Sequence, residues 1–384
     1  MRPGFVQSAE RLERLPTDLT HWEIGPFHPA VPGPLKLRLT LDGEIIAKLS
    51  YETGFAFRAL EKRFEMRPWR SGLPYADRLD PETAIFGQVA YCLAAESLMG
   101  LETPKRAQQV RAVLCELARI SAHFRGFVQV AKSVAADTFM HYALRDREKI
   151  LDLFELITGA RFTLNFLRFG GVAQDVTEGF LERVADVCDL LRARMKEYND
   201  LFSFNDAFLG RVCGTGIVTQ EVAIKHGLTG PNARGAGLSL DVRKAHPYLV
   251  YGQTDFEVPL GRGEFGVTGD VHDRFLVRLR EILQSIEIVK QVCESMADGP
   301  HQLLGPMDPL PTRAGEGFSR VESPRGLLAC YVASDGGNGP ARVQFVPPSV
   351  AALSALPELA QGACLEDLPV ILASLDLSVA EVDR

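Results

Sequence analysis

Long stretches with apolar residues at helical spacing dominate the middle of this chain. Gly100 and Gly159 follow two of these stretches, where a glycine in the left-handed conformation commonly ends a helix, and Thr103 precedes another as an expected cap. The pattern predicts helices over Pro81–Leu98, Pro104 to about Lys132, Asp137–Thr158, from after Thr177 to about Tyr198, about Asp270–Met296, and a shorter one within Gly54–Met66. A chain of this kind folds around a helical bundle.

Two β-hairpins are expected on either side of the bundle. Residues 34–50 alternate apolar and polar side chains around Asp42-Gly43, a strong signal for a tight turn. Residues Arg325–Val346 have the same character around the turn DGGNGP, whereas 299–324 is rich in Pro and Gly and predicts a surface connection. The predicted fold class is α+β: a large central helical bundle with a small N-terminal β-hairpin cap and a C-terminal β-hairpin.

The chain is expected to divide into four parts: a charged leader at 1–23, the N-terminal β cap at 24–53, the helical core at 54–300, and a C-terminal hairpin and tail at 301–384. With 384 residues, 46% of them hydrophobic, it is long enough to bury a large core. The net charge of −7 comes from interspersed acidic and basic residues, which argues against nucleic acid as a partner. The sequence has no apolar run long enough to cross a bilayer and no signal-peptide core, so we expect a cytoplasmic protein.

The cysteines argue against metal binding. There are seven, an odd number, with no C-x-x-C spacing, whereas iron–sulfur, nickel and zinc sites use closely spaced thiolates or Cys/His pairs. We expect reduced, buried thiols and no metal or cofactor bound by this chain.

Sequence segments spread over nearly the whole chain, from about residue 24 to Arg384, resemble segments of one family and follow one another in the same order. They include GPFHPAVPG (25–33), LPYADRLD (73–80), ELARISAH (116–123), REKILDLFELITGARF (147–162), GLTGPNARGAGLSLDVRKAHPY (227–248), ESPRGLLACYVASDGG (322–337) and SLDLSVAEVDR (374–384). Together they resemble the D subunits of the proton-pumping NADH:quinone oxidoreductases, or complex I, a family related to the large subunits of nickel–iron hydrogenases. Residues 24–384 would then form one family domain.

The resemblance implies a particular site. In the hydrogenases two C-x-x-C motifs hold nickel and iron, and the matching positions here, 78–81 and 375–378, contain no cysteine. Hydrogen chemistry is thereby excluded on ligand type. In the complex I family the emptied metal site has become the headgroup end of a quinone chamber. We therefore expect a cavity where the N-terminal cap meets the bundle, with His28, Tyr75 and Arg78 close to one another.

The resemblance also implies an assembly. Quinone is the substrate, an iron–sulfur cluster in the neighbouring small subunit supplies electrons, and NADH and flavin bind elsewhere in the complex. The other partners would be further peripheral-arm subunits and membrane-arm subunits, and the reaction would be coupled to ion translocation. The chain would lie on the cytoplasmic side of the inner membrane, peripheral through its partners, and be inactive in isolation.

The usual proton donors of the family are replaced in this sequence. His28 matches the first histidine of the family's first motif, but the second, donor histidine falls at Pro32, the tyrosine after R-[LM]-D falls at Pro81, and the partner carboxylate falls at Ser133. A quinone needs a proton near each carbonyl oxygen as it is reduced. Candidate donors are His28, Tyr75, Asp80 and His141.

Several interpretations stay open from the sequence. The site could reduce quinone with other donors, pass electrons to another acceptor in a related membrane-bound redox complex, or belong to a non-catalytic scaffold. Arg78 and Asp80 could form a local ion pair that braces their loop, or Arg78 could tune the potential of the partner's cluster. A charged set in the Gly-rich segment predicts either a solvated face or a buried ion network at a subunit interface: Arg234, Asp241, Arg243 and Lys244.

Overall fold

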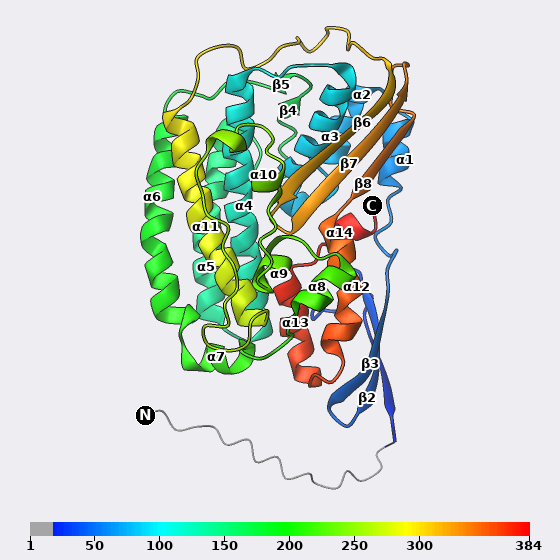
Figure 1. Ribbon diagram of the computed structural model, residues 1–384, viewed down its shortest axis with the longest axis vertical. Helices are drawn as coiled ribbons and strands as arrows, with labels where there is room; N and C mark the ends of the chain where they lie inside the picture. The colour runs from blue at the N-terminus through cyan, green and yellow to red at the C-terminus, as the bar shows by residue number, and fades with distance from the viewer. Residues whose placement is uncertain (1–17) are drawn as a thin grey trace.

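A computed structural model describes residues 18–384 and has a helical bundle at its centre (Figure 1). The bundle helices are α3 (Ala84–Met99), α4 (Lys105–Ser133), α5 (Asp137–Thr158), α6 (Phe180–Tyr198) and α11 (Val271–Glu294). Central α4 packs against both α5 and α11. Gly100 and Gly159 end α3 and α5 in the left-handed conformation, as predicted. Thr103 does not cap α4, because Pro104 occupies the N-cap position.

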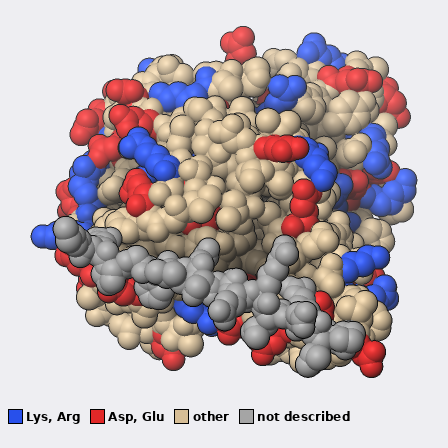
Figure 2. All heavy atoms as spheres, turned by 60° about the horizontal axis from the view of Figure 1, so that its bottom comes forward, with Lys and Arg blue, Asp and Glu red and all other residues tan. Residues whose placement is uncertain are grey.

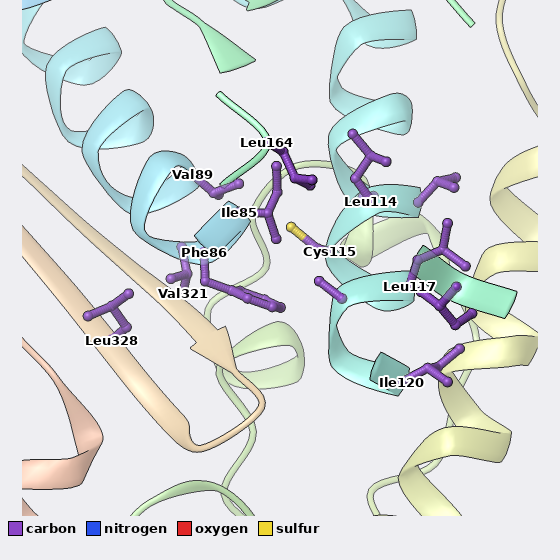
Figure 3. Packing of buried hydrophobic residues seen from close by; sticks show 14 of the residues in the cluster. Ile85, Phe86, Val89, Leu114, Cys115, Leu117, Ile120, Leu164, Val321 and Leu328 are labelled. Carbon is purple, nitrogen blue, oxygen red and sulfur yellow. The ribbon is translucent and has the colours of Figure 1, made fainter. Parts of the chain in front are cut away.

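One part of the main core lies between α3 and α4 and reaches the C-terminal sheet (Figure 3), and the same core continues to α5, α6 and α11. Ile85, Phe86 and Val89 of α3 and Leu114 and Leu117 of α4 are all buried there. Nearly every residue of α3 is buried, so this helix is apolar around its whole circumference and is covered on all sides.

The N-terminal sheet has three antiparallel strands in the order β1-β2-β3: β1 (Thr20–Ile24), β2 (Lys36–Asp42) and β3 (Ile45–Glu52). The predicted hairpin is present, with Gly43 at positive φ in its turn. Strand β1 was not predicted; it is a largely exposed edge strand that lacks a buried face to mark it. It falls at the end of the predicted leader, of which residues 1–17 lie outside the described residues.

The predicted C-terminal hairpin is present as β7 (Gly326–Asp335) and β8 (Arg342–Val346), and β6 (Ala314–Ser323) adds a third antiparallel strand to this sheet. Strand β6 lies in the segment predicted as a surface connection, and its glycines explain the error. Gly317 packs so closely on α3 that a Cβ there would lie 2.1 Å from the Ala94 carbonyl oxygen. The glycines that made this segment look like a loop are what let the strand approach the helix.

Short elements complete the chain: helices α1 (Leu60–Glu65), α2 (Trp69–Ala76), α7 (Asp206–Val212), α8 (Gln220–His226), α9 (Gly230–Gly235), α10 (Val242–Ala245), α12 (Pro348–Ala360), α13 (Leu368–Leu375) and α14 (Val379–Val382), the 3₁₀ turn η1 (Pro81–Thr83), and strands β4 (Leu167–Arg168) and β5 (Gly171–Val172). The predicted tail therefore contains three helices. A second core joins the N-terminal sheet to α8, α9, α12 and α13.

A buried ion network connects α4, α11, β6 and the segment from α9 to α10. Glu116 contacts Arg119 (Oε2 to Nε, 3.1 Å) and Arg243 (Oε2 to Nη1, 3.0 Å), and accepts hydrogen bonds from Tyr251 and Ser285. Burial alone would raise the pKa of Glu116, but Arg119 and Arg243, with those hydrogen bonds, lower it to about 2.

The same network continues through Arg234, which contacts Glu281 at 2.6 Å and Glu322 at 2.7 Å. Asp241 pairs with Arg243 at 2.6 Å. The predicted ion network is therefore present and buried within the chain, whereas Lys244 is exposed.

Candidate functional site

A cavity of about 650 Å³ lies between the N-terminal sheet, the bundle and the C-terminal segment, at the position expected from the sequence. Its walls come from five parts of the chain: the loop before β2, the segment at η1, the second half of α4, the turn between β6 and β7, and the region from α13 to α14. Among its lining residues are His28, Val31, Pro32, Asp80, Pro81, Glu82, Arg125, Gln129, Lys132, Ser133, Arg325, Leu372, Asp376, Leu377 and Ser378.

The first wall is the loop that carries the first motif. His28 is exposed, and its Nδ1 accepts a hydrogen bond from the Ala30 amide at 3.2 Å. Gly33 has a φ of +137°, and a Cβ there would lie 3.2 Å from Cβ of Val379. Glycine at this position lets the loop approach the C-terminal segment closely.

The second wall is one face of α4. Arg125, Gln129, Lys132 and Ser133 line the cavity at helical spacing. The Ser133 hydroxyl donates to the Val130 carbonyl at 2.7 Å, so its proton is used within its own helix. Arg125 also contacts Glu82, with 3.4 Å between Nε and Oε1.

The cavity floor forms where residues 78–81 meet residues 375–378. The Ser378 hydroxyl donates to Asp80 Oδ1 at 3.0 Å, and the Thr83 hydroxyl donates to Asp80 Oδ2 at 2.5 Å. Arg325, from the turn between β6 and β7, forms a buried ion pair with Asp80. The two segments that the resemblance matches to metal-binding motifs are thus in direct contact.

Asp376 adds a second buried carboxylate to this floor. It ends α13 in the left-handed conformation, with a φ of 53°, and is 7% exposed. Arg325 Nε donates to its carbonyl oxygen at 2.8 Å and lies 3.7 Å from Oδ2. Oδ2 is buried without a hydrogen-bond partner among the described residues. Asp376 is therefore a buried carboxylate of the floor that pairs with Arg325.

Glu381 lies behind the floor, on α14. Its Oε1 accepts a hydrogen bond from the Ser349 amide at 3.1 Å, and its side chain is buried. Burial and the neighbouring Asp80 raise the pKa of Glu381 to about 7, against the opposing effects of Arg325 and Ser349. At neutral pH this carboxyl is therefore partly protonated.

The structure brings together five of the eight residues predicted for the site: His28, Pro32, Asp80, Pro81 and Ser133 all line the cavity. Tyr75, Arg78 and His141 do not. Tyr75 packs against Phe64, with 6.1 Å between ring centroids, and His141 is exposed on α5. The sequence predicted that His28, Tyr75 and Arg78 lie together at the cavity. Of these three residues, His28 lines the cavity and Tyr75 and Arg78 do not.

The ion pairing of the 77–80 loop also differs from the expectation. Arg78 is exposed and lies 3.6 Å from Asp77, whereas Asp80 pairs with Arg325. Burial raises the pKa of Asp77 to about 6, which the hydrogen bond from the Asn165 amide partly opposes. The local pair between Arg78 and Asp80, one of the two interpretations that the sequence left open, is absent from the described contacts, because Asp80 turns inward and pairs with Arg325.

Sequence reasoning missed several residues of the site, notably Arg325 and Glu381. Both lie in segments quoted for the family resemblance, ESPRGLL and AEVDR, which is the only signal that pointed to them. Their role depends on contacts between residues far apart in the chain, such as Arg325 with Asp80.

Within residues 18–384, no set of three or more His, Cys, Asp or Glu side chains is arranged to hold a metal ion. All seven cysteines are free, and four are buried. None of the helices in this part of the chain combines the length and apolar character needed to span a bilayer. Figure 2 shows acidic and basic side chains interspersed over the lower end of the molecule.

Comparisons with known proteins give a consistent result. A model of the family described as the 49 Kd subunit of respiratory-chain NADH dehydrogenase matches residues 133–311 and 301–384. The chain is 39% identical over 362 residues to a D subunit of NADH-quinone oxidoreductase from Sorangium cellulosum, covering 94% of this chain and 93% of the relative. It is 39% identical over 360 residues to the D subunit of Desulforamulus reducens, and the match covers 94% of this chain and 97% of the relative. It is 35% identical over 392 residues to the D subunit of Geotalea uraniireducens, and the match covers 96% of this chain and 99% of the relative.

Proposed function

The chain belongs to the family of NADH-quinone oxidoreductase D subunits, and on that premise we propose that its cavity is a chamber in which a quinone is reduced. The observation that carries this proposal is the cavity of about 650 Å³ on the floor formed by Asp80, Arg325 and Ser378. Its volume lies within the range of small-molecule sites, and it combines apolar walls with a few polar groups.

The chain's own contribution is to hold the quinone and to supply protons. Val31, Leu372 and Leu377 offer apolar surface to a ring, and Asp80 and Asp376 offer carboxylates at the floor. Pro32 and Pro81 line the same cavity but carry no exchangeable proton. Of the predicted donor candidates, His28 and Asp80 line the cavity, and Asp80 accepts hydrogen bonds at both oxygens and pairs with Arg325, so we assign proton donation to His28, at a position that differs from the family's usual donors.

Electrons come from outside the chain in this proposal. They are delivered by an iron–sulfur cluster of the neighbouring small subunit, while NADH and flavin bind to other subunits of the peripheral arm. Membrane-arm subunits couple the reaction to ion translocation and hold the chain at the cytoplasmic face of the membrane. The isolated chain is then inactive, because it lacks an electron donor. The contact between Asp80 and Ser378 supports descent of the site from a hydrogenase-like metal site.

One observation favours a second function. The three usual donor positions are occupied by Pro32, Pro81 and Ser133, and the Ser133 hydroxyl is bonded to its own helix. A subunit that kept its fold and partners but lost quinone reduction would have this composition. The alternative is a non-catalytic scaffold; a subunit of a related membrane-bound redox complex with another electron donor or acceptor is a separate possibility that the sequence left open.

Inhibitor-sensitive reduction of quinone by the assembled complex separates the two functions. We expect the wild-type complex to reduce quinone and a quinone analogue to inhibit it. We expect the double variant Pro32→His, Pro81→Tyr to change the pH dependence of that rate, because it adds two donors to the cavity wall. His141→Gln is the matched control, since His141 lies outside the cavity, and should behave as the wild type. A wild-type complex without inhibitor-sensitive reduction would instead support the scaffold.

A further inference from the structure

Three polar side chains of α4 form one face of the cavity. Arg125, Gln129 and Lys132 are spaced four and then three residues apart, so they lie on the same side of the helix over about two turns. All three line the cavity. We call them the α4 donor face, because guanidinium, amide and ammonium groups all supply N–H donors.

Most of these donors have no partner within the described chain. Arg125 donates from Nε to Glu82 Oε1 at 3.4 Å, and its guanidinium makes no other hydrogen bond among residues 18–384. The side chains of Gln129 and Lys132 form neither a hydrogen bond nor an ion pair within the same residues. The α4 donor face therefore offers the cavity N–H groups that this part of the chain does not use.

The acidic residue that contacts this face is already compensated. Glu82 lies between two guanidinium groups: its Oε2 is 2.5 Å from Arg147 Nη2, and its Oε1 is 3.4 Å from Arg125 Nε. Two cations thus share one carboxylate at the start of the face. Glu82 therefore does not compensate the charge of Lys132, two turns further along α4.

The two carboxylates of the floor are also paired within the chain. Asp80 pairs with Arg325, and each of its oxygens accepts a hydrogen bond from a hydroxyl group. Asp376 Oδ2 lies 3.7 Å from Arg325, and Arg278 also acts on this carboxylate electrostatically. The α4 donor face, rather than the floor, is therefore where the cavity has hydrogen-bonding capacity to spare for a ligand.

A quinone has the complementary hydrogen-bonding character. Its two carbonyl oxygens accept hydrogen bonds and donate none, and negative charge develops on them as electrons arrive. Donors that are already in place where charge develops stabilise that charge most effectively. His28 lies on another wall, in the loop before β2, so the two walls can serve the two oxygens of one ring.

We propose that the α4 donor face binds one quinone oxygen and that Lys132 stabilises the negative charge that develops on it during reduction. This rests on the proposed function of the cavity and adds the wall against which one carbonyl group lies. The reaction still takes two electrons from the small subunit's cluster and two protons, one from protonated His28 and one from water. Lys132 gives up neither an electron nor a proton, and it remains an ammonium group throughout.

The test compares the binding of two quinones with the same ring to the assembled complex. The probes are lawsone, a hydroxynaphthoquinone that is ionised at neutral pH, and its methyl ether, which is neutral. Isothermal titration calorimetry without NADH measures both affinities in the absence of turnover. We expect the wild-type complex to bind the anion more tightly, by about 10-fold, because hydrogen bonds between charged groups are stronger. Lys132→Met should abolish this preference, and Lys132→Arg should keep it.

Two matched variants assign the effect to the cavity. Lys105→Met removes an exposed lysine at the other end of α4, outside the cavity, and should match the wild type. Gln129→Leu removes a neutral donor and should weaken both probes equally, by about 5-fold, with the preference intact. Lys132 lies in the last turn of α4, where its charge also stabilises the helix end. A change in stability alone would leave the ratio of the two affinities unchanged.

The outcomes separate this proposal from the proposed function. Equal affinities of the wild-type complex for the two probes, or a preference that survives Lys132→Met, would overturn the role of the α4 donor face. Inhibitor-sensitive reduction of quinone tests the function itself. A complex that prefers the anion but reduces no quinone would support the donor face and overturn the proposed function. A complex that reduces quinone without preferring the anion would do the reverse.

Discussion

Two buried glutamates in this protein have pKa values that are shifted in opposite directions. Glu116, inside the bundle, meets two guanidinium groups and two hydroxyl donors, and its pKa falls to about 2. Glu381, behind the cavity floor, interacts with Arg325 at longer range, and its pKa rises to about 7. Both are buried. The difference lies in direct contact: Glu116 pairs with two guanidinium groups, whereas Glu381 forms no ion pair among the described residues and lies near the negative charge of Asp80.

The largest expected loss of folding stability follows from a substitution in the ion network around Glu116. Glu116→Gln removes the anion shared by Arg119 and Arg243, and the loss of a buried partner costs about 3–5 kcal/mol of unfolding free energy. Urea denaturation of the chain, followed by circular dichroism, measures it. The matched control is Glu264→Gln, whose pair with Arg280 is partly exposed. We expect the control to stay within about 0.5 kcal/mol of the wild type. Equal losses in the two variants would contradict a structural role for the network.

The sequence anticipates the bundle well, because α4, α5 and α11 are long and strongly periodic. The sequence predicts the structure less well where contacts between distant parts of the chain determine the secondary structure or the position of a side chain. Strand β6 reads as a loop because its glycines serve close packing on α3. The same holds at the site: the loops that bring Asp80 to Arg325 are separated by more than two hundred residues, and no local pattern marks such a contact. Tyr75 belongs to the same sequence motif as Asp80 but faces Phe64 instead of the cavity.

The second effect concerns Arg325, the cation of the cavity floor. Arg325→Met leaves Asp80 and Asp376 without their partner, which should cost about 3 kcal/mol at pH 8. The loss should become smaller as pH falls below 7, because the freed carboxyls can take up protons and lose their charge. Urea denaturation at pH 8 and at pH 6 measures the difference. The loss caused by Glu116→Gln should not shrink in this way, since it leaves buried arginines. An Arg325→Met loss that is constant between pH 6 and 8 would remove the distinction between the two regions.

The third effect is the pH dependence contributed by the two glutamates. Glu381 has a folded pKa above its unfolded value of 4.5, so its stabilising contribution is complete below about 4.5 and is lost as pH rises to about 7. Glu116 has a folded pKa below 4.5, so its contribution is present above 4.5 and is lost as pH falls to about 2. Glu381→Gln should therefore flatten the stability curve between pH 5 and 8, whereas Glu116→Gln should flatten it below pH 4.5.

The smallest effect is expected at the α4 wall of the cavity. Ser133→Asp returns a carboxylate to the position where the family resemblance places one, at the last residue of α4. The Ser133 side chain is half-buried and close to the exposed Lys132, so the new charge keeps access to water. A negative charge at a helix C-terminus costs about 0.3–1 kcal/mol, and Ser133→Asn provides the uncharged control. Denaturation measures both variants. If Ser133→Asp lowered the free energy of unfolding as much as Arg325→Met does, the α4 wall of the cavity would be as intolerant of an additional carboxylate as the floor is.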